Sequence, residues 1–572
     1  RQNGDNRHTG NSREQALASI AEAWDRIPRG ALTTGYRIQI VSGRYAENEA
    51  PLYWEGRHGS YQYPVIINAA DGAGTVVLPI VNVYDCAYFY VMNLTIEAGG
   101  GDALHFEKCG HILVKNCVVM GIGDIENFEG PQEALKINQC QYVYIEGNNI
   151  SGGWDNAVDF VAVQYGHIVD NEIHRAREWC CYLKGGSAYF RVEVNEFYDG
   201  GTGGFSAGQG TGFEFMVSPW LHYEAYDIKF FNNIIHDTDG AGMGVNGGYN
   251  ILLAHNTLYR VGQISHAVEV VFGLRACDGN RDQCEKNLSV GGWGTAEPGA
   301  EEPIPNRNVF IYNNLIFNPP GYASTWSHFA VYGPRIPSAQ SNIPSPAKAD
   351  VNLDIRGNLI WNGAPALPLG VEESDRGCRP GNPTCNAEQL QRDNTINVTQ
   401  PALINPELGD FHPQGGSYVF TAATYLIPDF PGNDRPLRPQ TPEGNLVNQI
   451  NRDFDGVQRS VSSPPGAFTT SMPVKIDSGP AIIMPFEFSL MQNHPNPFNP
   501  NTTIEFSLPR PEHVSLTVYS ILGQEVENLI DGKLSMGIHR VNWNAIGQTA
   551  GVYYYTLQTG GYRQVRKAVF LK

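Results

Sequence analysis

Apolar and polar residues alternate in short runs through most of the chain, and Gly or Asn separates each run from the next. Residues 134–137 (ALKI) and 142–145 (YVYI) are two such runs. The runs are rich in β-branched and aromatic residues, and a period of two residues is typical of strands with one buried face. We therefore predict an all-β protein built from many short strands.

A second pattern groups these strands into a repeat. An Asn followed by one variable and one apolar residue recurs through the chain, at Asn93, Asn116, Asn148, Asn171, Asn195, Asn233, Asn256, Asn314 and Asn358. The shortest steps are 23 or 24 residues, and the longer steps equal this period plus an insertion. A period of this length accommodates three strands of roughly five residues and three turns. Such repeats, stacked on one another, predict a parallel β-helix over about residues 30–469.

The repeated Asn has a structural explanation. Asn tolerates the left-handed turn conformation, and its amide can bond to the backbone and to the Asn one coil away. We expect these side chains to form one column in one turn of the helix. Cys86, Cys109 and Cys140 lie seven or eight residues before an Asn of the repeat, which predicts a second column, of buried free thiols.

Four of the ten Cys residues form two local pairs. Cys277 and Cys284, and likewise Cys378 and Cys385, enclose six residues within loop-like sequence. Such pairs predict two disulfides and an oxidising compartment. A zinc site would need closer Cys spacing and nearby His, which these loops lack.

The N-terminal segment has a different periodicity. Residues 12–27 show the apolar spacing of a helix, with Ser12 and Gln15 as a candidate capping box, and this helix would cover the open end of the stack. A predicted strand at residues 36–41 follows, ending at Gly43-Arg44-Tyr45. This opening resembles that of secreted right-handed β-helix proteins, and the resemblance extends over about residues 8–469. It implies an architecture shared by many activities, polysaccharide lyases among them.

The C-terminal region is predicted to form a separate domain. After a Ser- and Pro-containing linker at 470–486, residues 487–572 contain short, evenly spaced strands that predict a small antiparallel β-sandwich. The stretch QNHPNPFNP at 492–500 closely resembles the C-terminal sorting domain of the type IX secretion system of Bacteroidetes-like bacteria. The resemblance implies export across the outer membrane, attachment at its surface or release, and the type IX machinery as a partner. The predicted domains are therefore 1–469, the linker 470–486, and 487–572.

Composition narrows the set of partners. The formal net charge of −19 argues against nucleic acid and anionic membranes. It suits a divalent cation or a neutral glycan, whereas an anionic glycan would need a local basic patch or a metal. No run of 18 apolar residues occurs, so no transmembrane segment is predicted.

The insertions indicate where a site could lie. Extra residues follow Val119, Asp199, Gly273 and Asn318, and we expect them to emerge on one side of the helix as a wall of loops. The Gly-rich stretch at 200–212, with Glu214, is expected to fold over the neighbouring strand face.

A row of polar residues is expected on that strand face. Its outward positions are His105, Lys136, Asp159, Tyr182, Lys184, Asn246 and Glu269. Neighbouring members of the row should be about 4.8 Å apart. Together with Trp179, Tyr182 and Trp220, the row predicts a sugar-binding groove in which His105, Lys136 and Glu269 also contact the polysaccharide.

A polysaccharide lyase acting on uronate polymers is the leading hypothesis. By analogy of roles, Lys184 would be the base, and Arg175 and Arg177 would lower its pKa or neutralise the substrate carboxylate. Asp155, Asp159 and Glu214 would hold Ca²⁺, which takes several oxygen ligands.

Two other functions compete with the lyase. A glycoside hydrolase would use two carboxylates, for which Asp155 and Asp159 are the candidates. A non-catalytic surface protein, such as an adhesin, a sheath or a self-associating filament subunit, would use the β-helix as a rod. Each candidate residue also has an ordinary explanation, since an exposed Lys is commonly a solvated charge and an Asp before a turn commonly caps it.

Overall fold

The computed structural model describes residues 4–123, 125–127, 130–432, 434, 445–460, 462–471, 488–490, 493, 496–508, 512–534 and 537–571. The chain divides into two compact units, Arg1–Ile476 and Asp477–Lys572. Of the predicted linker at 470–486, only residues 470 and 471 are among those described.

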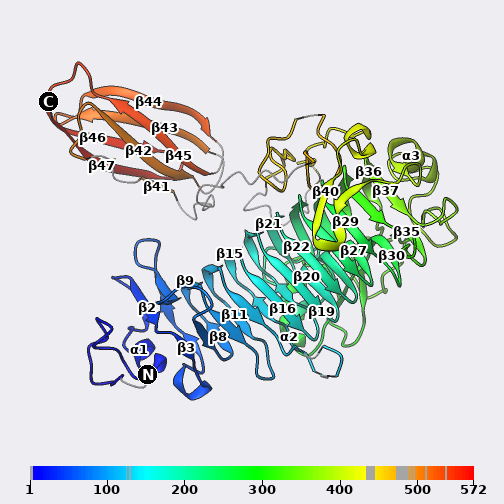
Figure 1. Cartoon of the computed structure of the whole chain (residues 1–572), viewed down its shortest axis with the longest axis horizontal. Coiled ribbons are helices and arrows are strands. Elements are labelled where there is room, and N and C mark those ends of the chain that lie inside the picture. The colour runs from blue at the N-terminus through cyan, green and yellow to red at the C-terminus, as the bar shows by residue number, and fades with distance from the viewer. Residues whose placement is uncertain are drawn as a thin grey trace. The chain divides into compact units, whose positions relative to one another are not determined.

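Three parallel sheets make up the first unit (Figure 1). Sheet A contains β1 (Gly30–Ala31), β2 (Tyr36–Ile40), β5 (Arg57–His58), β6 (Val65–Ala69), β9 (Ala87–Met92), β12 (Gly110–Lys115), β15 (Gln141–Glu146), β18 (Gln164–Val169), β21 (Ser187–Glu193), β25 (Ala225–Phe231), β28 (Gly248–Ala254), β33 (Arg307–Tyr312) and β36 (Val351–Arg356). Sheet B contains β3 (Gly43–Arg44), β7 (Val76–Leu78), β10 (Thr95–Glu97), β13 (Val118–Met120), β16 (Asn149–Gly153), β19 (Glu172–Ala176), β22 (Glu196–Gly200), β26 (Ile234–Thr238), β29 (Thr257–Val261), β34 (Leu315–Asn318), β37 (Leu359–Asn362) and β38 (Thr395–Ile396). Sheet C contains β4 (Trp54–Glu55), β8 (Val81–Tyr84), β11 (Leu104–Glu107), β14 (Leu135–Asn138), β17 (Val158–Val161), β20 (Trp179–Lys184), β23 (Gly203–Gly208), β27 (Ala241–Asn246), β30 (His266–Val271) and β35 (Ser327–Val331).

Each coil runs from a strand of sheet C to one of sheet A and then to one of sheet B. Thus β11, β12 and β13 form one coil, and β14, β15 and β16 form the next. Neighbouring coils pair in parallel register, as Leu104 with Leu135 and Ile112 with Val143. The predicted parallel β-helix is confirmed, but its described parallel strands end at β38 rather than near residue 469.

A column of Asn side chains lies at the turn from sheet A to sheet B. The backbone N–H and the Nδ2 of Asn148 both donate to Oδ1 of Asn171 at 2.9 Å. The same two bonds, at 3.0 and 2.9 Å, link Asn171 to Asn195. The column continues through Asn233, Asn256, Asn314, Asn358 and Asn394. The predicted stacking of the Asn residues is confirmed from Asn148 onward.

Asn93 and Asn116 do not belong to this column, so the prediction was wrong for both. Val118 pairs with Asn149, which aligns Asn148 with Cys117. The N–H of Cys117 donates to Oδ1 of Asn148 at 2.9 Å. Asn116 lies one residue earlier and has a left-handed φ of 53°, as Asn93 does at 58°. Both positions of the turn favour Asn, one for its amide and one for its backbone conformation, and the sequence pattern did not distinguish them.

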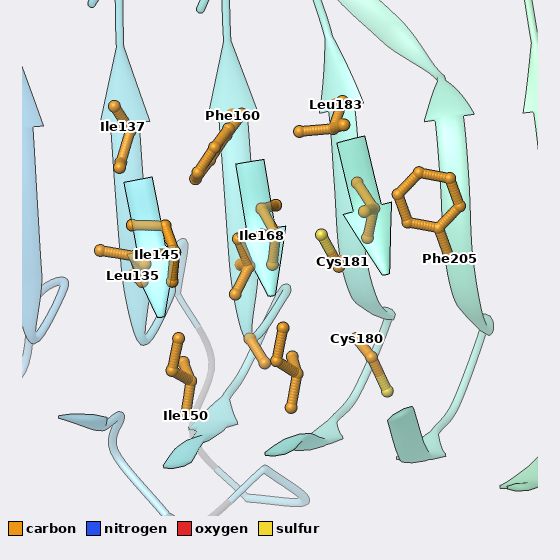
Figure 2. Close-up of a cluster of buried hydrophobic side chains, with 14 of the residues drawn as sticks. Leu135, Ile137, Ile145, Ile150, Phe160, Ile168, Cys180, Cys181, Leu183 and Phe205 are labelled. Atoms are coloured by element: carbon orange, nitrogen blue, oxygen red, sulfur yellow. The ribbon is translucent and has the colours of Figure 1, made fainter. Parts of the chain in front are cut away.

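Apolar side chains from the three sheets fill the interior (Figure 2). Ile137 of β14, Phe160 of β17 and Leu183 of β20 point inward from sheet C, and Ile145 and Ile168 meet them from sheet A. Because successive residues of a strand face opposite sides, the intervening residues of sheet C point outward.

The thiol column is also confirmed. Cys86, Cys109 and Cys140 are buried and free. The N–H of Cys86 donates to Sγ of Cys109 at 3.4 Å, and the N–H of Cys109 donates to Sγ of Cys140 at 3.2 Å. Both predicted disulfides are formed, Cys277 with Cys284 and Cys378 with Cys385.

The N-terminal helix is shorter than predicted. Helix α1 spans Ile20–Asp25 rather than 12–27, because the hydroxyl of Ser19 accepts the N–H of Glu22 and caps the helix there. Ser12 instead accepts the N–H of Gln15 at 3.3 Å in a turn. Ile20 and Trp24 are buried against the first coils.

The insertions leave the coils at two corners, not on one side as predicted. Those after β13 and β34 lie between sheets B and C, whereas those after β23, β30 and β35 lie between sheets C and A. The latter include helix α2 (Arg281–Ser289) and a small sheet of β24 (Gly210–Gly212), β31 (Gly273–Ala276) and β32 (Glu302–Ile304).

The Gly-rich stretch is not a loop up to Gly208, because it forms strand β23 within sheet C. A Cβ added at Gly204 would lie 2.5 Å from the carbonyl oxygen of Gly242, so close packing rather than flexibility explains this glycine. Past sheet C, helix α3 (Ala387–Asp393) and the antiparallel pair β39 (Leu403–Asn405) and β40 (Asp410–Pro413) complete the unit.

The second unit is an antiparallel two-sheet sandwich, as predicted. One sheet contains β41 (Ser489–Leu490), β42 (Asn501–Leu508) and β45 (Gly537–Asn544). The other contains β43 (Glu512–Ser520), β44 (Glu525–Leu534), β46 (Gly551–Gln558) and β47 (Arg563–Phe570). Leu516, Trp543 and Tyr555 are central to its core. Of the motif at 492–500, residues 492, 494 and 495 lie outside the described residues.

Candidate functional site

A cleft of about 900 Å³ follows the outer face of sheet C. Its floor contains side chains of sheet C, and its wall consists of the loops that connect sheet C to sheet A, including residues 209–212, 272–278 and 332–335. The lining residues run from Glu107 on β11 to Tyr332 after β35. Those strands are seven pairing steps apart, which is about 34 Å at 4.8 Å per step. This length suits a polymer.

The register of sheet C sets two outward rows. His105, Lys136, Asp159 and Tyr182 pair in sequence along the first, as predicted. Lys184 is two residues further along its strand and belongs to the second row, with Val161, Asn138 and Glu107. Lys136, Asp159 and Lys184 line the cleft.

Lys184 is held without a carboxylate. Its Nζ donates to the hydroxyl of Tyr182 at 2.9 Å and to Oε1 of Gln209 at 3.4 Å, and lies 4.4 Å from the centre of the Tyr182 ring. Within the described part of the chain, no acidic side chain forms an ion pair with it. The groups that position the amine are therefore neutral. They do not neutralise it, so the amine can interact with a ligand.

A buried ion pair fixes the backbone beside Lys184. Oε2 of Glu224 accepts the N–H of Gly185 at 3.0 Å, while Oε1 accepts from the guanidinium of Arg275 at 2.6 Å. Both side chains are fully buried. Arg275 also donates to the carbonyl oxygens of Leu221 and Trp293. Glu224 and Arg275 thus tie two wall loops to the corner that follows Lys184.

A second charged group occupies the other part of the floor. Nζ of Lys136 lies 2.9 Å from Oε1 of Glu133 and 3.1 Å from Oδ2 of Asp159. Burial, and next the charge of Asp159, raises the pKa of Glu133 to about 9. Glu133 is therefore protonated near neutral pH, and Lys136 is balanced chiefly by Asp159.

Arg175 and Arg177, the predicted partners of Lys184, are not among the residues that line the cleft. Arg175 is on sheet B, where its guanidinium donates to the carbonyl oxygen of Gly123. Arg177 lies in the turn from sheet B to sheet C, with its guanidinium 4.7 Å from the centre of the Trp154 ring. Both are close to Lys184 in the sequence. In the fold, however, Arg175 lies on sheet B and Arg177 at the corner between sheets B and C, and neither lines the cleft.

The predicted sugar-binding residues also fall in different places. Trp179 and Trp220 are buried at 3% and 4% exposure and serve as packing residues. Oε2 of Glu269 lies 3.0 Å from Nε2 of His266 and outside the cleft lining. His105 lies 3.3 Å from the amide of Asn138, and burial lowers its pKa. Of this set, only Lys136 lines the cleft.

The predicted calcium ligands do not gather. Oε1 of Glu214, in the turn η2 (Phe213–Phe215), accepts the N–H groups of Asp278 and Asn280 at 3.2 and 3.1 Å. In the described ranges, Asp155, Asp159 and Glu214 do not form a group with oxygen atoms within 4.8 Å of one another. The two acid–thiol groups at such distances both include disulfide-bonded Cys residues. These three carboxylates therefore do not fit a shared Ca²⁺.

Arg335 is the cleft residue that the sequence did not reveal. It lies in the loop after β35, lines the cleft and is exposed. No repeat or motif surrounds it, and its place follows only from how the loop folds back over sheet C.

Two family models match the chain. Residues 79–258 match the right-handed β-helix region, and residues 493–571 match the secretion system C-terminal sorting domain. The helix is therefore right-handed, and the second unit is similar to the sorting domains of secreted proteins. No helix within the described ranges is long and apolar enough to cross a membrane.

Several solved structures are similar to the chain at low identity. Pectate lyase Pel9A is 12% identical, with 82% of this chain and 94% of that chain covered and a TM-score of 0.40. The A-module of the Azotobacter vinelandii mannuronan C-5 epimerase AlgE4 is 12% identical, covering 52% and 82%, with a TM-score of 0.31. PfbA, a surface adhesin of Streptococcus pneumoniae, is 9% identical, covering 50% and 70%, with a TM-score of 0.31. No curated protein matches the chain.

Proposed function

We propose that the protein is exported by a type IX system of a Bacteroidetes-like bacterium and acts outside the cell or at its surface as a lyase on uronate-containing polysaccharides. Lys184 is the base. The observation that carries this proposal is an amine held by Tyr182 and Gln209, with no acidic partner among the described residues, at the floor of a cleft about 34 Å long.

The reaction is a β-elimination. Nζ of Lys184 takes up the proton at C5 of a uronate unit, and the electron pair of that C–H bond forms the C4–C5 double bond. The C4–O bond breaks at the same time, and the departing oxygen takes up a proton. A positioned base contributes roughly 10²- to 10⁴-fold to such a step.

The surroundings of Lys184 suit this role. Tyr182 is buried, and burial, followed by the charge of Asp159, raises its pKa, so its phenol remains neutral beside the amine. Glu224 fixes the next peptide through the N–H of Gly185. The amine therefore has a set position, which a base needs in order to reach one proton of the substrate.

The test is an assay for the unsaturated product, which absorbs in the ultraviolet. Pectate, alginate and glycosaminoglycans are incubated with the full chain, with Ca²⁺ and with a chelator. We expect absorbance to develop on at least one polymer and Lys184→Ala to reduce the rate by about 10²-fold or more. Lys286→Ala, an exposed Lys on α2 outside the cleft, is the matched control and should retain activity.

Two outcomes would redirect the proposal. If no polymer is cleaved but binding in polysaccharide-containing gels persists and depends on Lys184, the protein is a glycan-binding surface protein. If neither cleavage nor binding depends on Lys184, the assignment of the cleft is wrong. The comparison of rates with Ca²⁺ and with a chelator shows whether a divalent cation takes part in the reaction.

A further inference from the structure

Arg335 lines the cleft with an exposed side chain. Its Cζ lies 5.3 Å from the centre of the Phe272 ring and 5.2 Å from that of Tyr332. It forms no ion pair with any acidic side chain that the structure describes. The chain as a whole is acidic, with a net charge of −19. A guanidinium in the cleft that no described acidic side chain neutralises therefore favours the binding of an anion there.

The backbone holds this side chain in place. The N–H of Arg335 donates to the carbonyl oxygen of Ala347 at 2.9 Å, and the N–H of Ala347 donates to the carbonyl oxygen of Arg335 at 2.8 Å. With its Cα fixed by this bridge and its guanidinium placed against two rings, little conformational entropy is lost when a ligand binds.

The position of Arg335 relative to Lys184 follows from the sheet. Lys184 ends β20, and Arg335 follows β35, which is four pairing steps away in sheet C. Four steps correspond to about 19 Å along the cleft. Asp278 and Glu301 also line the cleft, and their charges disfavour an acidic group of the substrate next to them.

We propose that Arg335 is a second anion subsite, which binds a carboxylate or sulfate ester of an acidic polysaccharide whose reacting unit is at Lys184. This rests on the proposed function, because Lys184 defines where the reaction occurs. Arg suits the role because its planar guanidinium donates two parallel hydrogen bonds to such a group. The cleft thus selects chains long enough to reach both cations, with an acidic group at each.

The experiment compares oligosaccharides of increasing length from the polymer that the wild-type protein cleaves. We expect kcat/KM to rise once the chain spans both subsites. Arg335→Ala should lower kcat/KM by about 10- to 100-fold for long chains and leave short chains unchanged. Arg335→Lys should recover part of the loss. Arg379→Ala, an exposed Arg outside the cleft lining, is the matched control.

Chemical changes to the polymer identify the anion. Reduction of carboxylates to alcohols, or removal of sulfate esters, is assayed by binding in polymer-containing gels. The dependence on Arg335 should disappear with one of the two treatments, and its survival after both would overturn the proposal. Equal kcat/KM of Arg335→Ala and wild type at every length would also overturn it, while a loss in Lys184→Ala alone would leave the lyase proposal standing. If no polymer is cleaved, equal gel binding of Arg335→Ala and wild type overturns the subsite.

Discussion

The two corners that flank sheet A are built on opposite principles. At the corner between sheets A and B, each Asn of the column bonds to the next. Asn195, for example, contacts Asn171, Asn233 and the carbonyl oxygen of Ile168. At the corner between sheets C and A, insertions after β23, β30 and β35 replace the tight turn, and Lys184 and Arg335 face a cleft without acidic partners among the described residues. We call the corner between sheets A and B the closed corner and the one between sheets C and A the open corner. At the closed corner the Asn side chains bond within the fold, which stabilises the helix and leaves these groups occupied. The open corner can carry chemistry because the closed one fixes the coils.

The largest effect is expected from the buried pair that supports the open corner. Glu224→Ala leaves Arg275 buried without a counter-ion, and we expect it to lower the free energy of unfolding by about 3–5 kcal/mol. Glu224→Gln retains an acceptor for the N–H of Gly185 and should cost less. Chemical denaturation of the two variants measures the difference. Equal stability of wild type and Glu224→Ala would show that this corner is not held by the pair.

The next effect tests the register of the closed corner. Asn195→Ala removes the amide that links two coils and leaves buried backbone groups unpaired, with an expected loss of about 3 kcal/mol. Asn93→Ala is the matched control, because Asn93 lies one residue before the column and should lose only about 1 kcal/mol from its left-handed conformation. Thermal melting of both variants is the measurement. Similar losses would contradict the assigned register.

A third effect distinguishes the closed corner from the cleft floor by pH. The amides of the column do not titrate, whereas the pKa of Glu133, which contacts Lys136 of the cleft floor, is raised to about 9 by burial and by Asp159. Because the folded state retains a proton that the unfolded state releases near pH 4.5, stability should fall as the pH rises through this window. Glu133→Gln should flatten that dependence between about pH 5 and 9. Lys136, whose Nζ lies 2.9 Å from Oε1 of Glu133, opposes this rise in pKa but does not cancel it. Melting temperatures of wild type and Glu133→Gln across this range test it.

The closed corner was predictable from the sequence and the open one was not. Periodicity revealed the coils, the column from Asn148 and the thiol column, because each coil imposes the same local geometry on the residues it repeats. It misplaced Asn93 and Asn116 because two adjacent positions of the turn both favour Asn. Alternation also placed Lys136, Asp159 and Lys184 on one face. It could not place Arg335 or separate Arg175 from the cleft, since insertions follow no period and their folding depends on contacts distant in sequence.

The central claim is that Lys184 removes a proton from C5 of a uronate unit. Nuclear magnetic resonance of a uronate polymer in deuterated water follows the C5 proton directly and detects its removal whether or not the chain is then cleaved. With the wild-type protein we expect the H5 signal to decay, and with Lys184→Ala we expect it to persist while Lys286→Ala behaves as wild type. An H5 signal that persists with the wild-type protein on every polymer, or decays equally fast with Lys184→Ala, would contradict the account.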